Sequence, residues 1–159
     1  MIELMKVKSL LFGLTVALIF FISIPAGLIW LNSALSLSLY TFPIAKAMGF
    51  ILSLTGFLLF FYCFNLFILL GKGTPVPIEP PNKLVSNKLY KYSRNPIYIG
   101  YFMMLFGIAF YFGHLLLFVY ALLSIPGIHF YVVSFEEPVL LKRFGKSYTE
   151  YYKATPRWL

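Results

Sequence analysis

Three long stretches without a charged residue constrain this chain most strongly. Residues 9–45, 47–70 and 97–135 contain no Asp, Glu, Lys or Arg over 37, 24 and 39 positions, respectively. About 20 consecutive apolar residues are enough for one helix to cross the hydrocarbon core of a bilayer. With 60% hydrophobic and 11% charged residues, the whole chain also lies outside the composition of soluble domains. The pattern therefore predicts an all-α polytopic membrane protein.

The third uncharged stretch is too long for one helix, and Gly113 and His114 near its middle suit a tight hairpin. This division predicts four spans, at residues 9–31, 47–70, 97–112 and 115–135. At about 1.5 Å per residue the third span covers only about 24 Å, less than the usual core of about 30 Å. We expect a single membrane domain, residues 1–159, in which residues 1–70 form a two-helix scaffold and residues 71–159 carry the motifs.

Positive charges predict the orientation, because Lys and Arg near span ends stay cytoplasmic. With both termini inside, twelve of the thirteen Lys and Arg residues lie on the cytoplasmic side and only Lys46 lies outside. The twelve are Lys6, Lys8, Lys72, Lys83, Lys88, Lys91, Arg94, Lys142, Arg143, Lys146, Lys153 and Arg157. We expect anionic lipid headgroups, and not nucleic acid, as their partners. A signal peptide is the alternative for the first span, whose length favours a retained helix.

Helix-packing and helix-bending signals occur within the predicted spans. Gly49, Ser53 and Gly56 recur at helical spacing and predict the close approach of another helix. Prolines that should kink, bend or break a helix occur at three places: Pro25, Pro126 next to Gly127, and Pro138. The only cysteine, Cys63, excludes an intramolecular disulfide, and we expect no metal site.

The loop and the tail at the predicted cytoplasmic face also carry local signals. The loop prolines that should stiffen the chain are Pro75, Pro77, Pro80 and Pro81. Asn95 followed by Pro96 predicts a helix start, with asparagine as the N-cap and proline at the first helical position. Residues 138–144 suit a short basic amphipathic helix that ends at Gly145. Ser147 and Glu150 match a capping box for a last helix ending before Pro156.

Two adjacent glutamates, Glu136 and Glu137, follow directly after the last uncharged stretch. Carboxylates at the membrane end of a helix are costly unless they are paired, hydrated or bound to a ligand. The hairpin at residues 113–114 should bring Arg94 and Asn95 close to them. A helix N-terminus attracts anionic groups, whereas carboxylates suit an ammonium group or hydroxyls. Together they predict a site for a zwitterionic ligand.

These residues resemble the superfamily of isoprenylcysteine carboxyl methyltransferases and phospholipid (phosphatidylethanolamine) methyltransferases. The resemblance covers residues 84–159, about half the chain. It is carried by Arg94, Asn95, Pro96, Tyr98 and Gly100, then Glu136, Glu137 and Leu140, then Phe144, Gly145, Tyr148, Tyr151, Pro156, Arg157 and Trp158. The resemblance implies that S-adenosylmethionine binds among these motifs and that its methyl group is transferred to a lipid-borne acceptor from the bilayer.

The resemblance also implies residue roles. The catalytic candidates are Arg94, Asn95 and Glu137; the cofactor-binding candidates are Tyr90, Asn95, Pro96, Tyr98, Gly100, Glu136 and Glu137; weaker substrate candidates are His129, Tyr151 and Arg157. Asn95 replaces the family's more usual histidine and cannot act as a base at neutral pH. A carboxylate acceptor of the prenylcysteine kind needs no deprotonation, whereas a phospholipid amine must lose a proton before it attacks.

Two other hypotheses stay open at this stage. Sterol reductases share the Arg-x-Pro-x-Tyr-x-Gly segment, but they lack the glutamate pair that this chain has at Glu136 and Glu137. A non-catalytic membrane scaffold with decayed motifs is the second alternative, and it rests on the substitution at Asn95. The acceptor and the oligomeric state do not follow from the sequence.

Overall fold

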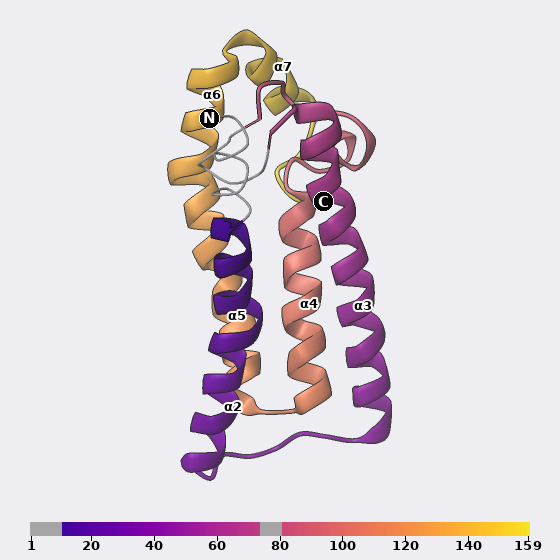
Figure 1. Ribbon diagram of the computed structural model, residues 1–159, viewed down its shortest axis with the longest axis vertical. Helices are drawn as coiled ribbons and strands as arrows, with labels where there is room; N and C mark the ends of the chain where they lie inside the picture. The colour runs from indigo at the N-terminus through magenta and orange to yellow at the C-terminus, as the bar shows by residue number, and fades with distance from the viewer. Residues whose placement is uncertain (1–10, 74–80) are drawn as a thin grey trace.

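The computed structural model describes residues 11–73 and 81–159, which fold into an elongated helical bundle (Figure 1). The first helix runs over Leu11–Ala34 and contains the π-helix η1 (Ile19–Ser23) and helix α2 (Ile24–Ala34). The next elements are α3 (Pro43–Leu66), η2 (Phe67–Gly71), the 3-10 turn η3 (Lys88–Lys91) and α4 (Pro96–Phe112). The chain ends with α5 (Leu115–Tyr131), η4 (Val132–Glu136), α6 (Glu137–Phe144) and α7 (Lys146–Ala154).

Within the described residues, three helices are long and apolar enough to cross a membrane: Leu11–Ala34, Pro43–Gly71 and Leu115–Phe144. Helix α4 is a shorter apolar helix, as expected from the short uncharged segment that precedes Gly113. Large apolar side chains point outward along these helices, including Leu18, Phe50 and Leu123, and a soluble monomer rarely exposes apolar patches of this extent. The all-helical class and the presence of several candidate spans are confirmed.

The helix boundaries differ most from the expected ones at two places. Helix α3 begins at Pro43 and not at residue 47, because proline suits the first turn of a helix. Lys46 therefore lies in that first turn, where it is exposed. The last long helix continues past residue 135 as far as Phe144. Lys6, Lys8, Pro75, Pro77 and Pro80 lie outside the described residues.

Glycines allow α3 and α4 to pack backbone to backbone. The two helices are antiparallel, and Gly49 faces Gly107 while Gly56 faces Gly100 two turns further along. A Cβ atom added to Gly49 would lie 2.7 Å from the Gly107 carbonyl oxygen, which is closer than real Cβ contacts. The close approach predicted from Gly49, Ser53 and Gly56 is confirmed, and the partner helix is α4.

The predicted hairpin between α4 and α5 is also confirmed. Gly113 ends α4 with φ +70°, in the left-handed region that favours glycine. Its amide donates to the carbonyl of Ala109 at 2.8 Å, and its carbonyl accepts the amide of Tyr40 at 2.8 Å. The hairpin thus makes α4 and α5 neighbours and ties them to the connection between α2 and α3.

Two of the prolines follow π-helical turns. The five-residue π-helices η1 and η4 end two residues before Pro25 and Pro138. The residue before each proline donates to the carbonyl five positions back, Ile24 to Ile19 and Glu137 to Val132. The wider turn gives the proline ring room beside the preceding carbonyls. At Pro126, α5 continues without the break that was one of the expected outcomes.

The tail folds into two short helices, as predicted. Gly145, with φ +52°, separates α6 from α7, and α7 ends at Ala154 before Pro156. The capping-box prediction is wrong, because α7 begins at Lys146 and Ser147 lies inside its first turn. The carbonyl of Gly145 instead accepts both the amide and the hydroxyl of Thr149, at 3.1 and 3.2 Å.

Replacing Gly56 by alanine should destabilise the bundle. The new Cβ would lie 2.7 Å from the carbonyl oxygen of Gly100 and 2.8 Å from the amide nitrogen of Met104. Overpacking of this kind costs about 1–3 kcal/mol, so the midpoint of thermal unfolding in detergent should fall. Gly27→Ala is the matched control, because nothing lies within 4 Å of that position and alanine favours a helix. Equal midpoints for the two variants would contradict the packing of α3 on α4.

Candidate functional site

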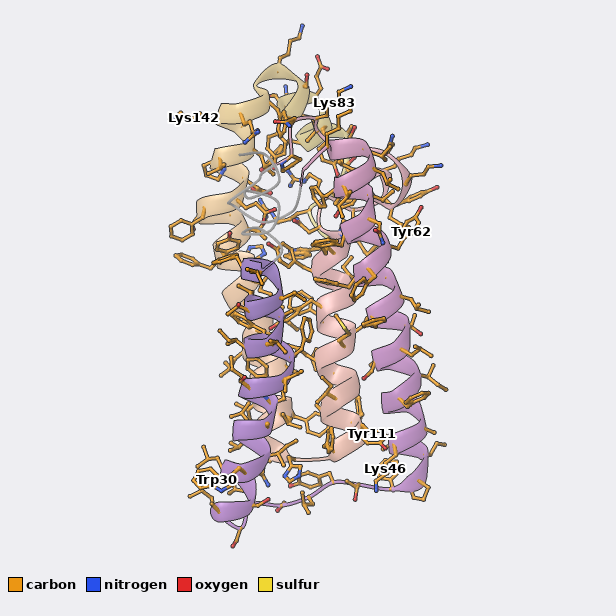
Figure 2. All side chains as sticks on the ribbon, in the orientation of Figure 1. Trp30, Lys46, Tyr62, Lys83, Tyr111 and Lys142 are labelled. Carbon is orange, nitrogen blue, oxygen red and sulfur yellow. The ribbon has the colours of Figure 1, made fainter. Side chains whose placement is uncertain are left out.

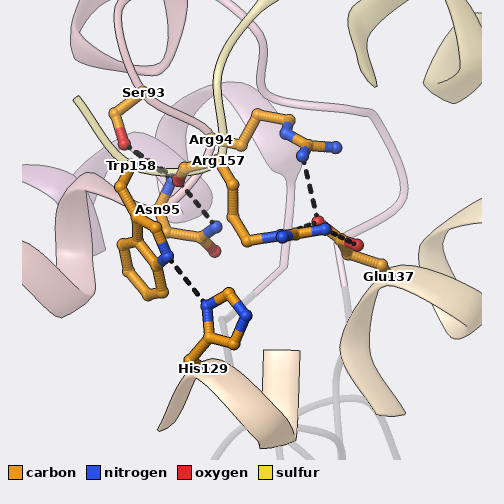
Figure 3. Close-up of polar contacts among 7 residues, drawn as sticks. All are labelled: Ser93, Arg94, Asn95, His129, Glu137, Arg157 and Trp158. Carbon is orange, nitrogen blue, oxygen red and sulfur yellow. Dashed lines mark hydrogen bonds and ion pairs between the residues drawn. The ribbon is translucent and has the colours of Figure 1, made fainter. Parts of the chain in front are cut away.

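Polar side chains gather at the end of the bundle where α4 begins and where α5 passes through η4 into α6, and Figure 3 shows a close-up of seven of these residues. They come from the turn at residues 93–95, from helices α4 to α6, and from residues 155–159. We call this last segment the C-terminal strap. The strap leaves α7 and returns beside the start of α4. The turn at residues 93–95 and the end of the chain therefore lie side by side here.

The strap is hydrogen-bonded to the turn before α4. The amide of Arg94 donates to the carbonyl of Pro156 at 2.9 Å. The carbonyl of Arg157 accepts the side-chain amide of Asn95 at 3.0 Å and the hydroxyl of Ser93 at 3.3 Å. Ser93 and Asn95 are buried, so these bonds are shielded from water and fix the position of the strap.

Asn95 therefore has a different task from the one its position predicts. It is the N-cap residue of α4, and Pro96 is the first helical residue, as predicted. Its side chain, however, makes no capping hydrogen bond to its own helix. Its amide nitrogen is engaged by the Arg157 carbonyl instead, so the asparagine joins two segments that are distant in the sequence.

Glu137 is held by two arginines from these two segments (Figure 3). Arg157 binds it with both ends of its fork, Nε to Oε1 at 2.8 Å and Nη2 to Oε2 at 2.9 Å. Arg94 adds a third contact, Nη2 to Oε1 at 3.1 Å. The proximity of Arg94 to Glu137 that the hairpin predicted is confirmed. One carboxylate faces two guanidinium groups, which leaves a net positive charge in the cluster.

Arg94 has hydrogen-bond donors that no described group uses. Its side chain is only 7% exposed, and its carbon Cζ lies 3.9 Å from the centroid of the Tyr152 ring. The Nε and Nη1 atoms are buried and have no hydrogen-bond partner within residues 11–73 and 81–159. Buried donors without partners are costly, so these two donors are suited to an anionic ligand.

Glu136 has a different environment from its neighbour. Its Oε2 accepts a hydrogen bond from the hydroxyl of Tyr98 at 2.8 Å, whereas the arginine contacts described above go to Glu137. Adjacent helical residues point about 100° apart, so the two carboxylates have separate partners.

Three other predicted residues lie in packed regions beside the site. Tyr151 donates to the carbonyl of Tyr90 at 2.7 Å, and both tyrosines are buried in a cluster with Tyr148. Burial there raises the pKa of Tyr148 to about 12. Gly100 lies in the α3–α4 contact described above. Their predicted roles in cofactor or substrate binding stay predictions.

His129 is bonded to the strap. The indole nitrogen of Trp158 donates to its Nδ1 at 3.1 Å, and the Trp158 ring lies 6.0 Å from that of Phe102 on α4. Trp158 was noted in the sequence as part of the tail motif, but nothing there indicated a contact with His129. Ser93 carried no sequence signal, because a single serine in a polar turn is common.

The fold and the site define a helical membrane protein with a buried cluster of charges at one end of its bundle. The sequence model of the phospholipid methyltransferase family matches residues 26–147, and the chain belongs to this family. It is thus an integral membrane methyltransferase that uses S-adenosylmethionine. No significant match was found among curated proteins or among solved structures.

The match ends at Ser147, so most of α7 and the whole strap lie beyond it. The family assignment favours a methyltransferase over the sterol-reductase alternative. Arg157 and Trp158 lie outside the matched residues, and their contacts with Glu137 and His129 join them to the site.

Glu137→Gln should loosen the strap. The change removes the counter-ion of Arg94 and Arg157, and an uncompensated buried charge costs on the order of 3 kcal/mol. We expect a lower unfolding midpoint and faster tryptic cleavage after Arg157, followed by mass spectrometry. Glu150→Gln is the control, because its pair with Lys146 is exposed and such pairs contribute little. Equal cleavage rates in the wild type and the Glu137 variant would contradict the contact.

Proposed function

We propose that this methyltransferase acts on the amine of a membrane glycerophospholipid, of which phosphatidylethanolamine is the simplest example. The observation that carries the proposal is the difference between the two glutamates: Glu137 is neutralised by two arginines, whereas Glu136 is bonded to a phenol. Among the described residues Glu136 has no cationic partner, and such a carboxylate suits an ammonium group and can accept its proton. In addition, residues 131–135, before the glutamates, contain no basic side chain for a carboxylate acceptor.

The proposed arrangement in the membrane has four spans, with α4 as the third, and both termini and the site on the cytoplasmic side. Helix α4 is packed along α3 and joined to α5 by a tight hairpin, which supports its passage through the same layer. Lys83 and Lys142 lie at the site end of the bundle, and Lys46 lies at the opposite end (Figure 2). The positive-inside rule places the first of these ends in the cytoplasm.

The residues present fit the charges of S-adenosylmethionine. The bound cofactor supplies an electrophilic methyl group on a sulfonium centre. The Nε and Nη1 donors of Arg94 have no partner among the described residues, and one of them would hold the cofactor's carboxylate through a charge-assisted hydrogen bond. The further cofactor contacts that the family resemblance implies are Tyr90, Asn95, Pro96, Tyr98, Gly100, Glu136 and Glu137, of which we assign Glu136 to the acceptor. In this proposal Glu137 acts by orienting Arg94.

Glu136 has the remaining chemical task. An alkylammonium group has no lone pair, so its proton must leave before the nitrogen can attack the methyl group. Asn95 cannot accept that proton, and Glu137 is occupied by Arg94 and Arg157. Glu136 would accept it, while the Tyr98 hydroxyl at 2.8 Å holds the carboxylate in place. Exclusion of water by the surrounding bilayer would favour the attacking neutral amine.

Glu136→Gln tests this assignment. The purified protein in lipid nanodiscs would be given S-adenosylmethionine with a labelled methyl group and phosphatidylethanolamine, and lipid products would be separated and counted. Loss of a general base lowers rates by about 10²–10⁴-fold, so we expect a fall of at least 100-fold in transfer. Calorimetric binding of S-adenosylmethionine should change little, and Glu150→Gln should retain both properties.

Three outcomes would contradict the proposal at different points. Transfer by Glu136→Gln at the wild-type rate would remove Glu136 as the proton acceptor. Methylation of a prenylcysteine carboxylate in place of the phospholipid amine would show that the acceptor is wrong. A folded wild-type protein that binds no S-adenosylmethionine would contradict the cofactor assignment and favour a non-catalytic scaffold.

A further inference from the structure

His129 lies deeper in the bundle than the glutamates. It is on α5, seven residues before Glu136 on a continuous helix, which corresponds to about 11 Å along the helix axis. Its side chain is exposed at the surface of the bundle. In the proposed orientation it therefore stands below the headgroup level, on the side of the hydrocarbon core.

The contact with Trp158 determines which ring nitrogen of His129 carries a proton. An indole N–H can only donate, so Nδ1 of His129 must accept the hydrogen bond, whose length is 3.1 Å. An imidazole whose Nδ1 is an acceptor has its proton on Nε2. His129 is thereby fixed as a hydrogen-bond donor through Nε2, and it cannot act there as a base.

The strap also fixes the direction of this donor. Trp158 is placed by the strap, whose backbone is bonded to Ser93 and Asn95, and by its contact with the Phe102 ring. Figure 3 shows Nε2 of His129 directed away from Trp158, toward the side on which Arg157 and Glu137 lie. The described residues give this Nε2 no hydrogen-bond partner. The Nε2–H donor of His129 therefore points toward the level of Glu136 and Glu137 from one side of the bundle.

We propose that Nε2–H of His129 binds an ester carbonyl of the acceptor lipid, and that Trp158 is the positioning residue for this contact. The inference rests on the proposed function and deepens it. In a diacyl glycerophospholipid the ester carbonyls lie several bonds deeper in the membrane than the amine. A lipid whose amine meets Glu136 would present these carbonyls toward the depth of His129. Together, His129 and Trp158 make the enzyme selective for acceptor lipids with two ester-linked acyl chains.

The test compares two acceptors that differ only in these carbonyls: diacyl phosphatidylethanolamine and its dialkyl ether analogue, in nanodiscs of otherwise identical composition. One neutral hydrogen bond contributes about 0.5–1.5 kcal/mol, so the wild type should prefer the diacyl lipid by roughly three- to tenfold in kcat/KM, chiefly through KM. His129→Phe should abolish the preference. His129→Gln, which retains an N–H donor, should restore part of it. Binding of S-adenosylmethionine should be unchanged in both variants.

A second measurement isolates the role of Trp158. Trp158→Phe retains an aromatic ring against Phe102 and removes only the donor. The chain has two histidines, so the ¹⁵N resonances of His129 can be assigned with one His114 variant. The wild type should show the Nε2–H tautomer, and Trp158→Phe should show a mixture of tautomers together with a smaller diacyl preference.

The outcomes separate this inference from the proposed function. Methylation of both lipids with equal kcat/KM by the wild type would overturn the role of His129 and leave the proposed function standing. Absence of methylation of either lipid would overturn the proposed function and the inference with it. An unchanged His129 tautomer in Trp158→Phe would overturn the positioning role of Trp158.

Discussion

The interaction on which the rest of the site depends is the one between Glu137 and its two arginines. Arg94 precedes α4, Arg157 lies in the C-terminal strap, and Glu137 begins α6. One carboxylate thus joins three segments that are distant from one another in the sequence. With two guanidinium groups and one carboxylate, the cluster retains a positive charge, and two donors of Arg94 have no acceptor in the described part of the chain. The same contacts that hold the strap in place therefore prepare the group that would receive an anionic part of the cofactor.

The bundle supplies the rigidity that this arrangement requires. The glycine contacts of α3 with α4 bring the two backbones together over two helical turns, so the start of α4 has a fixed position. The hairpin at Gly113 sets α5 beside α4, and the π-turn before Pro138 lets one helix continue past a proline to present Glu136 and Glu137. The packing of α4 on α3 thus fixes the start of α4, and the hairpin and the π-turn bring the two glutamates beside it.

Part of this arrangement could be predicted from the sequence, because it follows from local signals. Uncharged stretches predicted the helices, and Gly113 predicted the hairpin. Because a short hairpin makes α4 and α5 neighbours, it also predicted that Arg94 and Glu137 lie close together. Asn95 shows where local rules stop: N-cap preference describes bonds to the residue's own helix, yet its side chain is bonded to a carbonyl 62 positions away. The predicted start of α7 was also wrong. The carbonyl of Gly145 accepts the amide and the hydroxyl of Thr149, so α7 begins at Lys146 and not after a serine cap. The contact of Trp158 with His129 depends on the path of the strap. No periodic pattern in the sequence predicts that path, so the contact could not be predicted.

The central claim is that the C-terminal strap completes the site at the start of α4. Calorimetry of S-adenosylmethionine binding to a chain that ends at Ala154, compared with the full chain in the same nanodiscs, tests it most directly. Helical content by circular dichroism would establish that the bundle of the shortened protein is intact. Loss of the Asn95 and Glu137 contacts to the strap should weaken binding at least tenfold. Binding by an intact shortened bundle with the affinity of the full chain would contradict the claim.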